Sequence, residues 1–196
     1  MTGFDPMPLP GSGGAYAPAR QFVRREGLPA IALCTVTFGL AFLATVFTVQ
    51  TPYDVLIWPV SALLFMALRT RRIARWTWPL TGSAIGLFAA ELNIGMGRMQ
   101  AALLTFATGA EAIVAATIMN KRPRLLVAAL VASALSTLIV HIGLAVGAQP
   151  WRIEHAGLWF SSHAFGMLLF VPLFALGTRS LRTRQSEKGL FNLVIF

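Results

Sequence analysis

The stretch KRPRLLVAALVASALSTLIVHIGLAV, residues 121–146, decides the fold of this chain. It joins a short basic cluster to the run Leu125–Val146, which contains no Asp, Glu, Lys or Arg. An α-helix rises about 1.5 Å per residue, so about 20 apolar residues cross the hydrocarbon core of a bilayer. The stretch therefore predicts a transmembrane helix with its cations on one side of the membrane.

The same length criterion selects further membrane spans along the chain. Four more long apolar runs satisfy it: Leu28–Val49, Trp76–Met96, Met99–Met119 and Leu158–Leu176. Another run, Val55–Leu68, is shorter and contains Trp58-Pro59; because the residue before a proline is disfavoured in helical geometry, we expect the helix to start at Pro59. The fold class predicted is an all-α polytopic membrane protein, a six-helix transmembrane bundle with a short broken second helix.

Composition agrees with a membrane protein and excludes several other classes. Hydrophobic residues make up 56% and charged residues 12%, whereas soluble domains carry about 25% charged residues. The formal charge of +9 does not indicate nucleic acid, because the cations form short clusters between apolar runs, where lipid headgroups and insertion bias account for them. We therefore expect membrane lipids and no nucleic acid as partners. Cys34 is the only cysteine, which excludes a disulfide within the chain.

The cations also predict the orientation of the bundle. Of the 16 Lys and Arg residues, all but Arg98 and Arg152 fall on one side of six crossings. The positive-inside rule places that side in the cytoplasm, so we expect a multi-pass protein of the bacterial inner membrane with both termini cytoplasmic. Residues 1–27 are then a flexible arm, 28–177 the transmembrane domain, and 178–196 a basic linker with a short apolar tail.

Polar side chains inside the predicted spans indicate a site, because ionisable groups in a bilayer are costly. Counting along the helices puts most of them in the outer part of the bundle and Glu111 deeper, near the midplane. A helix that starts inside the membrane also leaves N–H groups that only protein or a cavity can accommodate. We therefore expect a pocket open to the periplasmic side, and its candidate ligand-binding residues are Trp58, Ser61, Glu91, Asn93, Glu111, His141 and His163.

Other interpretations of these polar residues remain open. They can simply hydrogen-bond between helices and hold the bundle together. A metal or haem site is not predicted, since the histidines lie on separate helices without diagnostic spacing, and the sequence identifies no cofactor. The chain also lacks GxSxG, HExxH, P-loop and GxGxxG motifs, so we expect a protein that is not an enzyme. Gly82 and Gly86, spaced as GxxxG, predict close helix packing within the bundle.

Four segments resemble a known family. They are Ile57–Ala62, Ala90–Asn93, Gly109–Ala112, and Trp159–Gly166 followed by Pro172. Together they are similar to the first membrane-associated sensor (MASE) domain class over about Leu28 to Leu176. The chain departs from that pattern at Ala62, where the family usually has glycine, and at His163, where it usually has aspartate. Such bacterial domains typically precede histidine kinase modules or modules that make and degrade cyclic di-GMP.

The resemblance implies a non-catalytic, bacterial membrane sensor-like domain that binds a small-molecule ligand or a partner helix from the periplasmic side. Two alternatives remain. One is an accessory transmembrane subunit of a larger membrane complex, for example a bioenergetic one, with a membrane-protein partner. It is favoured by the lack of an output module after Ser180. The other is the substrate-binding component of an energy-coupling-factor vitamin transporter.

Overall fold

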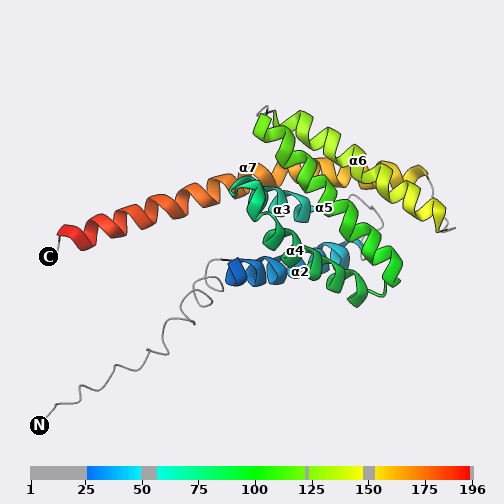
Figure 1. The fold of residues 1–196 in the computed structure, drawn as a ribbon, viewed down its shortest axis with the longest axis horizontal. Helices are drawn as coiled ribbons and strands as arrows, with labels where there is room; N and C mark the ends of the chain where they lie inside the picture. Colours follow the sequence, from blue (N-terminus) through cyan, green and yellow to red (C-terminus); the bar gives the residue numbers. More distant parts are fainter. Residues whose placement is uncertain (1–25, 50–56, 122–123, 148–152, 195–196) are drawn as a thin grey trace, which may run out of the picture.

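The computed structural model describes residues 26–49, 57–121, 124–147 and 153–194 (Figure 1). Within these ranges the chain is helical and contains no strand, which confirms the all-α prediction. The elements are α2 (Leu28–Val49), α3 (Pro59–Arg69), the 3-10 turn η2 (Ile73–Arg75), α4 (Thr77–Asn93), α5 (Arg98–Lys121), α6 (Leu125–Val146) and α7 (Ile153–Val194).

The helices pack as two groups that share α5. α2 packs mainly against α4. On the other side the short helix α3 packs against α5 and α7, and α6 packs against both of these (Figure 1). α3 buries most of its 11 residues, and Val60, Phe65 and Leu68 are fully enclosed. The shortest helix of the bundle therefore lies at its centre.

Two glycines allow α4 to lie directly against α2. A Cβ at Gly82 would overlap the carbonyl oxygen of Ala30, and a Cβ at Gly86 would overlap that of Cys34. Beside them, the buried hydroxyls of Thr37 and Ser83 lie 3.2 Å apart and share a hydrogen bond. The prediction that this GxxxG pair serves packing within the bundle is confirmed.

Helix α6 shows that the bundle is organised for an apolar environment. Its outward face carries exposed large side chains such as Leu126, Leu138 and Val146, whereas its buried face carries Ala132 and Ser133. A helix of a soluble protein has the opposite arrangement, with its apolar stripe toward the core.

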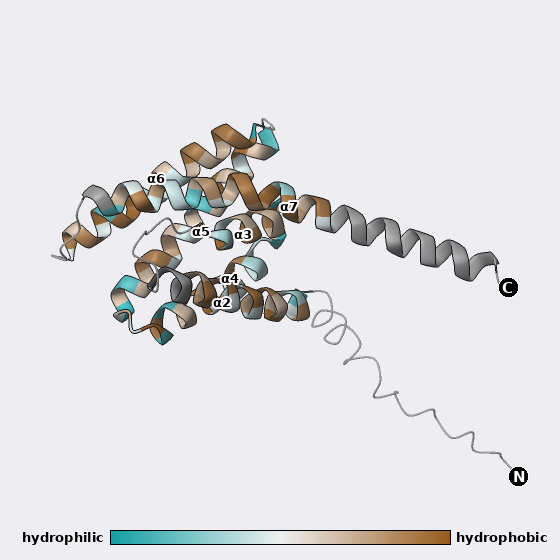
Figure 2. Ribbon diagram, turned by 180° about the vertical axis from the view of Figure 1, so that it is seen from behind, coloured by the Kyte–Doolittle hydropathy of each residue, from teal (hydrophilic) through white to brown (hydrophobic). Residues whose placement is uncertain are grey.

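Among the residues that the structure describes, three helical segments are long and apolar enough to cross a membrane: Arg98–Lys121, Leu125–Val146 and His155–Gly177 of α7. Figure 2 shows brown, hydrophobic residues along the helices and most of the teal, hydrophilic residues near the helix ends. The length of these helices and their exposed apolar faces fit a protein that resides in a membrane.

Several helix boundaries follow the sequence prediction. α2 and α6 have the predicted bounds, and α3 begins at Pro59. Trp58, just before it, is extended (φ −95°, ψ 97°), as a residue that precedes proline should be. α4 ends at Asn93, three residues before the expected Met96, and the turn that follows uses Gly95 at a positive φ of 90°.

Helix α7 is longer than the predicted sixth span at both ends. It begins at Ile153 and continues to Val194, so residues 178–194, where we expected a linker and a tail, belong to the same helix (Figure 1). The sequence of this extension contains many Arg, Leu, Gln, Glu and Lys residues, which are good helix formers. One helix therefore runs from inside the bundle to its far end at Val194.

Candidate functional site

The site begins at Trp58, the residue just before α3, where the backbone packs against α7. The backbone N–H of Trp58 donates a hydrogen bond to the carbonyl oxygen of Ser162 at 3.2 Å. Gly166, one turn further along α7, allows this approach, because a Cβ there would lie 2.8 Å from the carbonyl carbon of Trp58 and overlap its oxygen. Pro59 at the first helical position then turns the chain into α3.

The carboxylate of Glu111 on α5 is the centre of the site. Ser61 of α3 donates its hydroxyl to Oε2 at 2.6 Å, and Ser133 of α6 donates its hydroxyl to Oε1 at 2.7 Å. His163 of α7 contacts Oε2 through Nδ1. We call Ser61, Glu111, Ser133 and His163 the Glu111 cluster. Its four side chains come from four helices, and none is more than 1% exposed.

Two tryptophans hold the imidazole of His163. The Trp159 ring stacks on it with centroids 4.2 Å apart, and the Trp58 ring does so at 5.7 Å. Trp159 in turn donates its indole N–H to the hydroxyl of Ser136 on α6 at 3.0 Å. The rings therefore fix the orientation of His163 and add a further link between α6 and α7.

The contacts within the Glu111 cluster offset the cost of burying a carboxylate. A carboxylate removed from water costs several kcal/mol unless charged or hydrogen-bonding groups surround it. Here each carboxylate oxygen accepts a serine hydroxyl, and the imidazole adds a third partner. The cluster can therefore keep four helices in one register.

The geometry differs from that of a hydrolytic triad. In a triad, histidine joins the nucleophile and the carboxylate through its two different ring nitrogens. In this protein Ser61 Oγ lies 3.2 Å from His163 Nδ1, the same nitrogen that contacts Glu111. In the part of the chain that the structure describes, no three His, Cys, Asp or Glu residues gather as a metal site requires.

Four of the seven predicted ligand-binding residues come together. Trp58, Ser61, Glu111 and His163 form one contiguous set of contacts. The other three lie apart, and no contact described for them reaches the Glu111 cluster. Glu91 is buried on α4, His141 is half-buried on α6, and Asn93 is exposed at the end of α4.

The predicted depth of Glu111 is corrected by these contacts. Counting from helix ends put Glu111 deeper than His163, yet the two side chains touch. One reason is that α7 begins at Ile153 and not at the expected Leu158, so His163 lies further along its helix than the count assumed. Packed helices also cross at an angle, so residue counts from their ends do not measure a common depth.

Two residues of the site, Ser133 and Trp159, were not among those predicted from the sequence. Ser133 interrupts the apolar run of α6, and Trp159 precedes His163 by about one helical turn. Both signals were present, but a serine in a transmembrane helix more often bonds its own backbone, as Thr137 does here to Ser133 O at 2.8 Å. Only the packing of α6 against α5 and α7 gives Ser133 and Trp159 their roles.

Three cavities lined by described residues lie elsewhere. One of about 680 Å³ lies between α4 and α5, and two of about 570 Å³ and 340 Å³ lie near Arg71. None of the three is lined by any of the seven predicted ligand-binding residues.

No family model, curated protein or solved structure matches the chain, so only its own residues and geometry bear on its function.

Proposed function

We propose that this chain is a membrane sensor-like domain in which the Glu111 cluster responds to a ligand or partner helix and α7 carries the response. The observation behind the proposal is that His163 and residues as far as Val194 belong to one helix. We expect a displacement of His163 from Glu111 to be carried along α7, past Pro172, to its far end. Rigid shifts of this kind are a common form of signal transmission in proteins.

Buried polar atoms without partners support a ligand-binding role. Among the described residues, Trp58 Nε1, Glu91 Oε2 and His141 Nδ1 are buried and have no hydrogen-bond partner. Such atoms are uncommon in native structures, because each costs the free energy of its desolvation. A ligand or partner helix that enters from the outer end of the bundle and reaches Trp58 Nε1 would satisfy that atom, and Trp58 would transmit its presence to the imidazole on which it stacks.

We further propose a six-pass topology in the bacterial inner membrane with both termini in the cytoplasm. Glu26, just before α2, supports this arrangement, since it forms ion pairs with Arg71 at 2.9 Å and Arg75 at 3.8 Å. The start of α2 and the α3–α4 connection are therefore at the same end of the bundle, as an even number of crossings between them requires. This cation-rich end is assigned to the cytoplasm by the positive-inside rule.

Cysteine labelling tests the topology at the two ends of α5. In a Cys34→Ala background, Arg98→Cys should react with a membrane-impermeant maleimide in intact spheroplasts, whereas Lys121→Cys should react only after permeabilisation. Both native side chains are exposed, so the difference reports the side of the membrane and not burial. Labelling of both positions from outside would contradict the six-pass arrangement.

Spin labelling tests transmission along α7. With nitroxides at Lys121→Cys and Arg182→Cys in the Cys34→Ala background, His163→Ala should shift or broaden the distance distribution, because it removes the contact of α7 with Glu111. Leu169→Ala is the matched control, since Leu169 lies on the same helix and is 47% exposed. A His163→Ala distribution equal to that of the control would refute the role of α7.

A second candidate is an accessory subunit of a larger membrane complex. It is favoured by the groove of about 680 Å³ between α4 and α5, whose lining is almost entirely apolar and includes Ile85, Phe88, Phe106 and Ile113. Thr105 also lines this groove, and its hydroxyl has no hydrogen-bond partner among the described residues. A transmembrane helix of another protein would fill the groove and give Thr105 a partner. Stoichiometric membrane proteins retained in mild detergent would favour this candidate over the sensor.

A further inference from the structure

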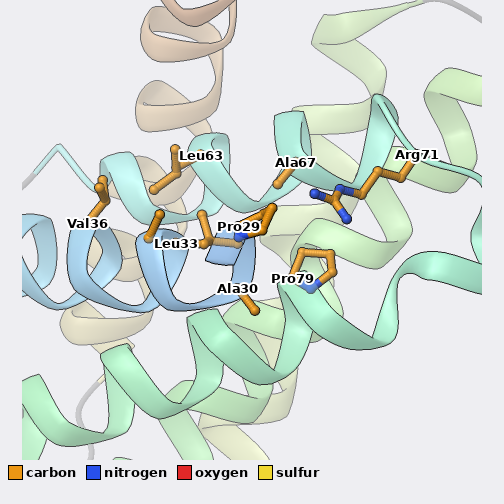
Figure 3. Close-up of a pocket in the computed structure, with 9 residues that line it drawn as sticks. Pro29, Ala30, Leu33, Val36, Leu63, Ala67, Arg71 and Pro79 are labelled. Atoms are coloured by element: carbon orange, nitrogen blue, oxygen red, sulfur yellow. The ribbon is translucent and has the colours of Figure 1, made fainter. Parts of the chain in front are cut away.

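Two cavities of opposite character meet at Arg71. The first, about 570 Å³, is lined by Glu26, Thr70, Arg71, Arg72 and Arg75. The second, about 340 Å³, lies between α2, α3 and α4, and its other lining residues are apolar, among them Leu33, Leu63 and Ala67. Figure 3 shows this apolar cavity, with the Arg71 side chain extending toward Pro79 at its edge. Arg71 is the residue that the two linings share.

The polar cavity has an excess of positive charge. Three guanidinium groups face one carboxylate, that of Glu26. Glu26 forms an ion pair with Arg71 at 2.9 Å and a longer one with Arg75 at 3.8 Å. Arg72 is exposed and has no ion pair among the described residues. The cavity therefore suits an anion, and guanidinium groups bind phosphate oxygens well.

The surroundings of the polar cavity are those of a membrane–water interface. Trp76 is buried beside it and donates its indole N–H to the carbonyl oxygen of Leu68 at 2.9 Å. Ile73 lies between the arginines in sequence and is 69% exposed. Tryptophan is enriched at the headgroup level of bilayers, and an exposed isoleucine among arginines is favourable there. We therefore expect these arginines to lie near the lipid phosphates.

The apolar cavity has a structural cause. α2 packs mainly on α4 and α3 packs on α5 and α7, so α2 and α3 meet only along a small contact. The space between them is bordered by small side chains such as Ala30 and Ala67. It starts at Arg71 and continues along α2 and α3 to Leu63 and Val36, which is the direction a lipid chain follows from its headgroup.

We propose that an anionic phospholipid binds at this place, with its phosphate among Arg71, Arg72 and Arg75 and one acyl chain between α2 and α3. The two adjoining cavities match the two parts of such a molecule. A zwitterionic lipid fits the polar cavity less well, because its cationic group offsets the charge of its phosphate. A free phosphate fits only the polar cavity and leaves the apolar cavity empty. The site does not depend on the sensor role of the Glu111 cluster.

Native mass spectrometry of the full chain in a neutral detergent tests the headgroup. Dioleoyl phosphatidylglycerol should bind more tightly than dioleoyl phosphatidylcholine. At about 1 kcal/mol per basic residue near a lipid surface, Arg72→Gln with Arg75→Gln should weaken phosphatidylglycerol binding about 30-fold. Arg98→Gln, an exposed arginine at the other end of the bundle, should leave the affinity unchanged. Equal losses in the two variants, or equal binding of the two lipids, would overturn the proposal.

Two further arms test the acyl chain. Ala67→Phe fills the apolar cavity without a change of charge and should weaken phosphatidylglycerol binding, whereas Ala145→Phe, on the exposed face of α6, should not. Inorganic phosphate at the same concentration should fail to displace the lipid. Displacement by phosphate would show a site for free phosphate instead, and unchanged binding by Ala67→Phe would refute the acyl position. Equal melting temperatures of the variants confirm that each one is folded.

Discussion

Glu111→Ala should lower the free energy of unfolding by about 3 kcal/mol, the cost of breaking a buried pair by removing one partner. The carboxylate is fully buried and accepts the hydroxyls of Ser61 and Ser133 at 2.6 Å and 2.7 Å. Without it, the buried hydroxyl of Ser133 loses its acceptor, and Ser61 and the imidazole of His163 keep only their mutual contact at 3.2 Å. Unfolding in mixed micelles with increasing dodecyl sulfate measures the loss.

Two comparisons show whether the network itself is responsible. His163→Ala together with Glu111→Ala should cost clearly less than the sum of the single changes, because the second change removes a group that the first left unpaired. Glu91→Ala is the matched control: Glu91 is also buried, but its Oε2 has no hydrogen-bond partner among the described residues. Additive single changes, or an equal loss in Glu91→Ala, would mean that the Glu111 cluster does not hold the bundle.

Gly166→Ala should destabilise the protein by about 2 kcal/mol, the usual range for one methyl group forced into a packed region. The added Cβ would lie 2.8 Å from the carbonyl carbon of Trp58 and overlap its oxygen, both backbone atoms. A backbone carbonyl cannot rotate away as a side chain does, so the approach to α3 must separate from α7. The hydrogen bond from Trp58 N–H to Ser162 O should weaken with it.

Gly157→Ala on the same helix is the control for that substitution. A Cβ at Gly157 meets no atom within 4 Å, so alanine should be neutral there or stabilise the helix by up to about 1 kcal/mol. The melting temperatures of the two variants, together with tryptophan fluorescence as a report on Trp58, measure the difference. Equal behaviour of Gly166→Ala and Gly157→Ala would show that α3 and α7 do not approach each other so closely.

The helices themselves were largely predictable from the sequence. The bounds of α2 and α6 follow from the length of their apolar runs, and the start of α3 follows from the steric effect of Pro59 on Trp58. These are local properties of the chain. The extension of α7 to Val194 was not predicted. The composition of a charged segment after an apolar run does not distinguish a helix from a linker.

The candidate site was only partly predictable. Unusual polar residues in apolar helices singled out Ser61, Glu111 and His163, and the structure brings these three side chains into contact, although the sequence placed Glu111 at a different depth. The separation of Asn93 from them, and the contribution of Ser133, depend on how each helix is rotated about its axis. That rotation is set by contacts between helices, such as Gly86 against Cys34, and not by the pattern within one helix.

The continuity of α7 has a consequence for anything attached to its far end. Each residue of an α-helix turns the chain by about 100°, so the helix fixes an angular phase between the imidazole of His163 and whatever follows Val194. A domain or partner bound to that end would have a fixed orientation about the helix axis relative to the bundle. Inserting one residue into α7 would rotate the bound domain by about 100°. Inserting seven residues, which is close to two full turns, would nearly restore its original orientation.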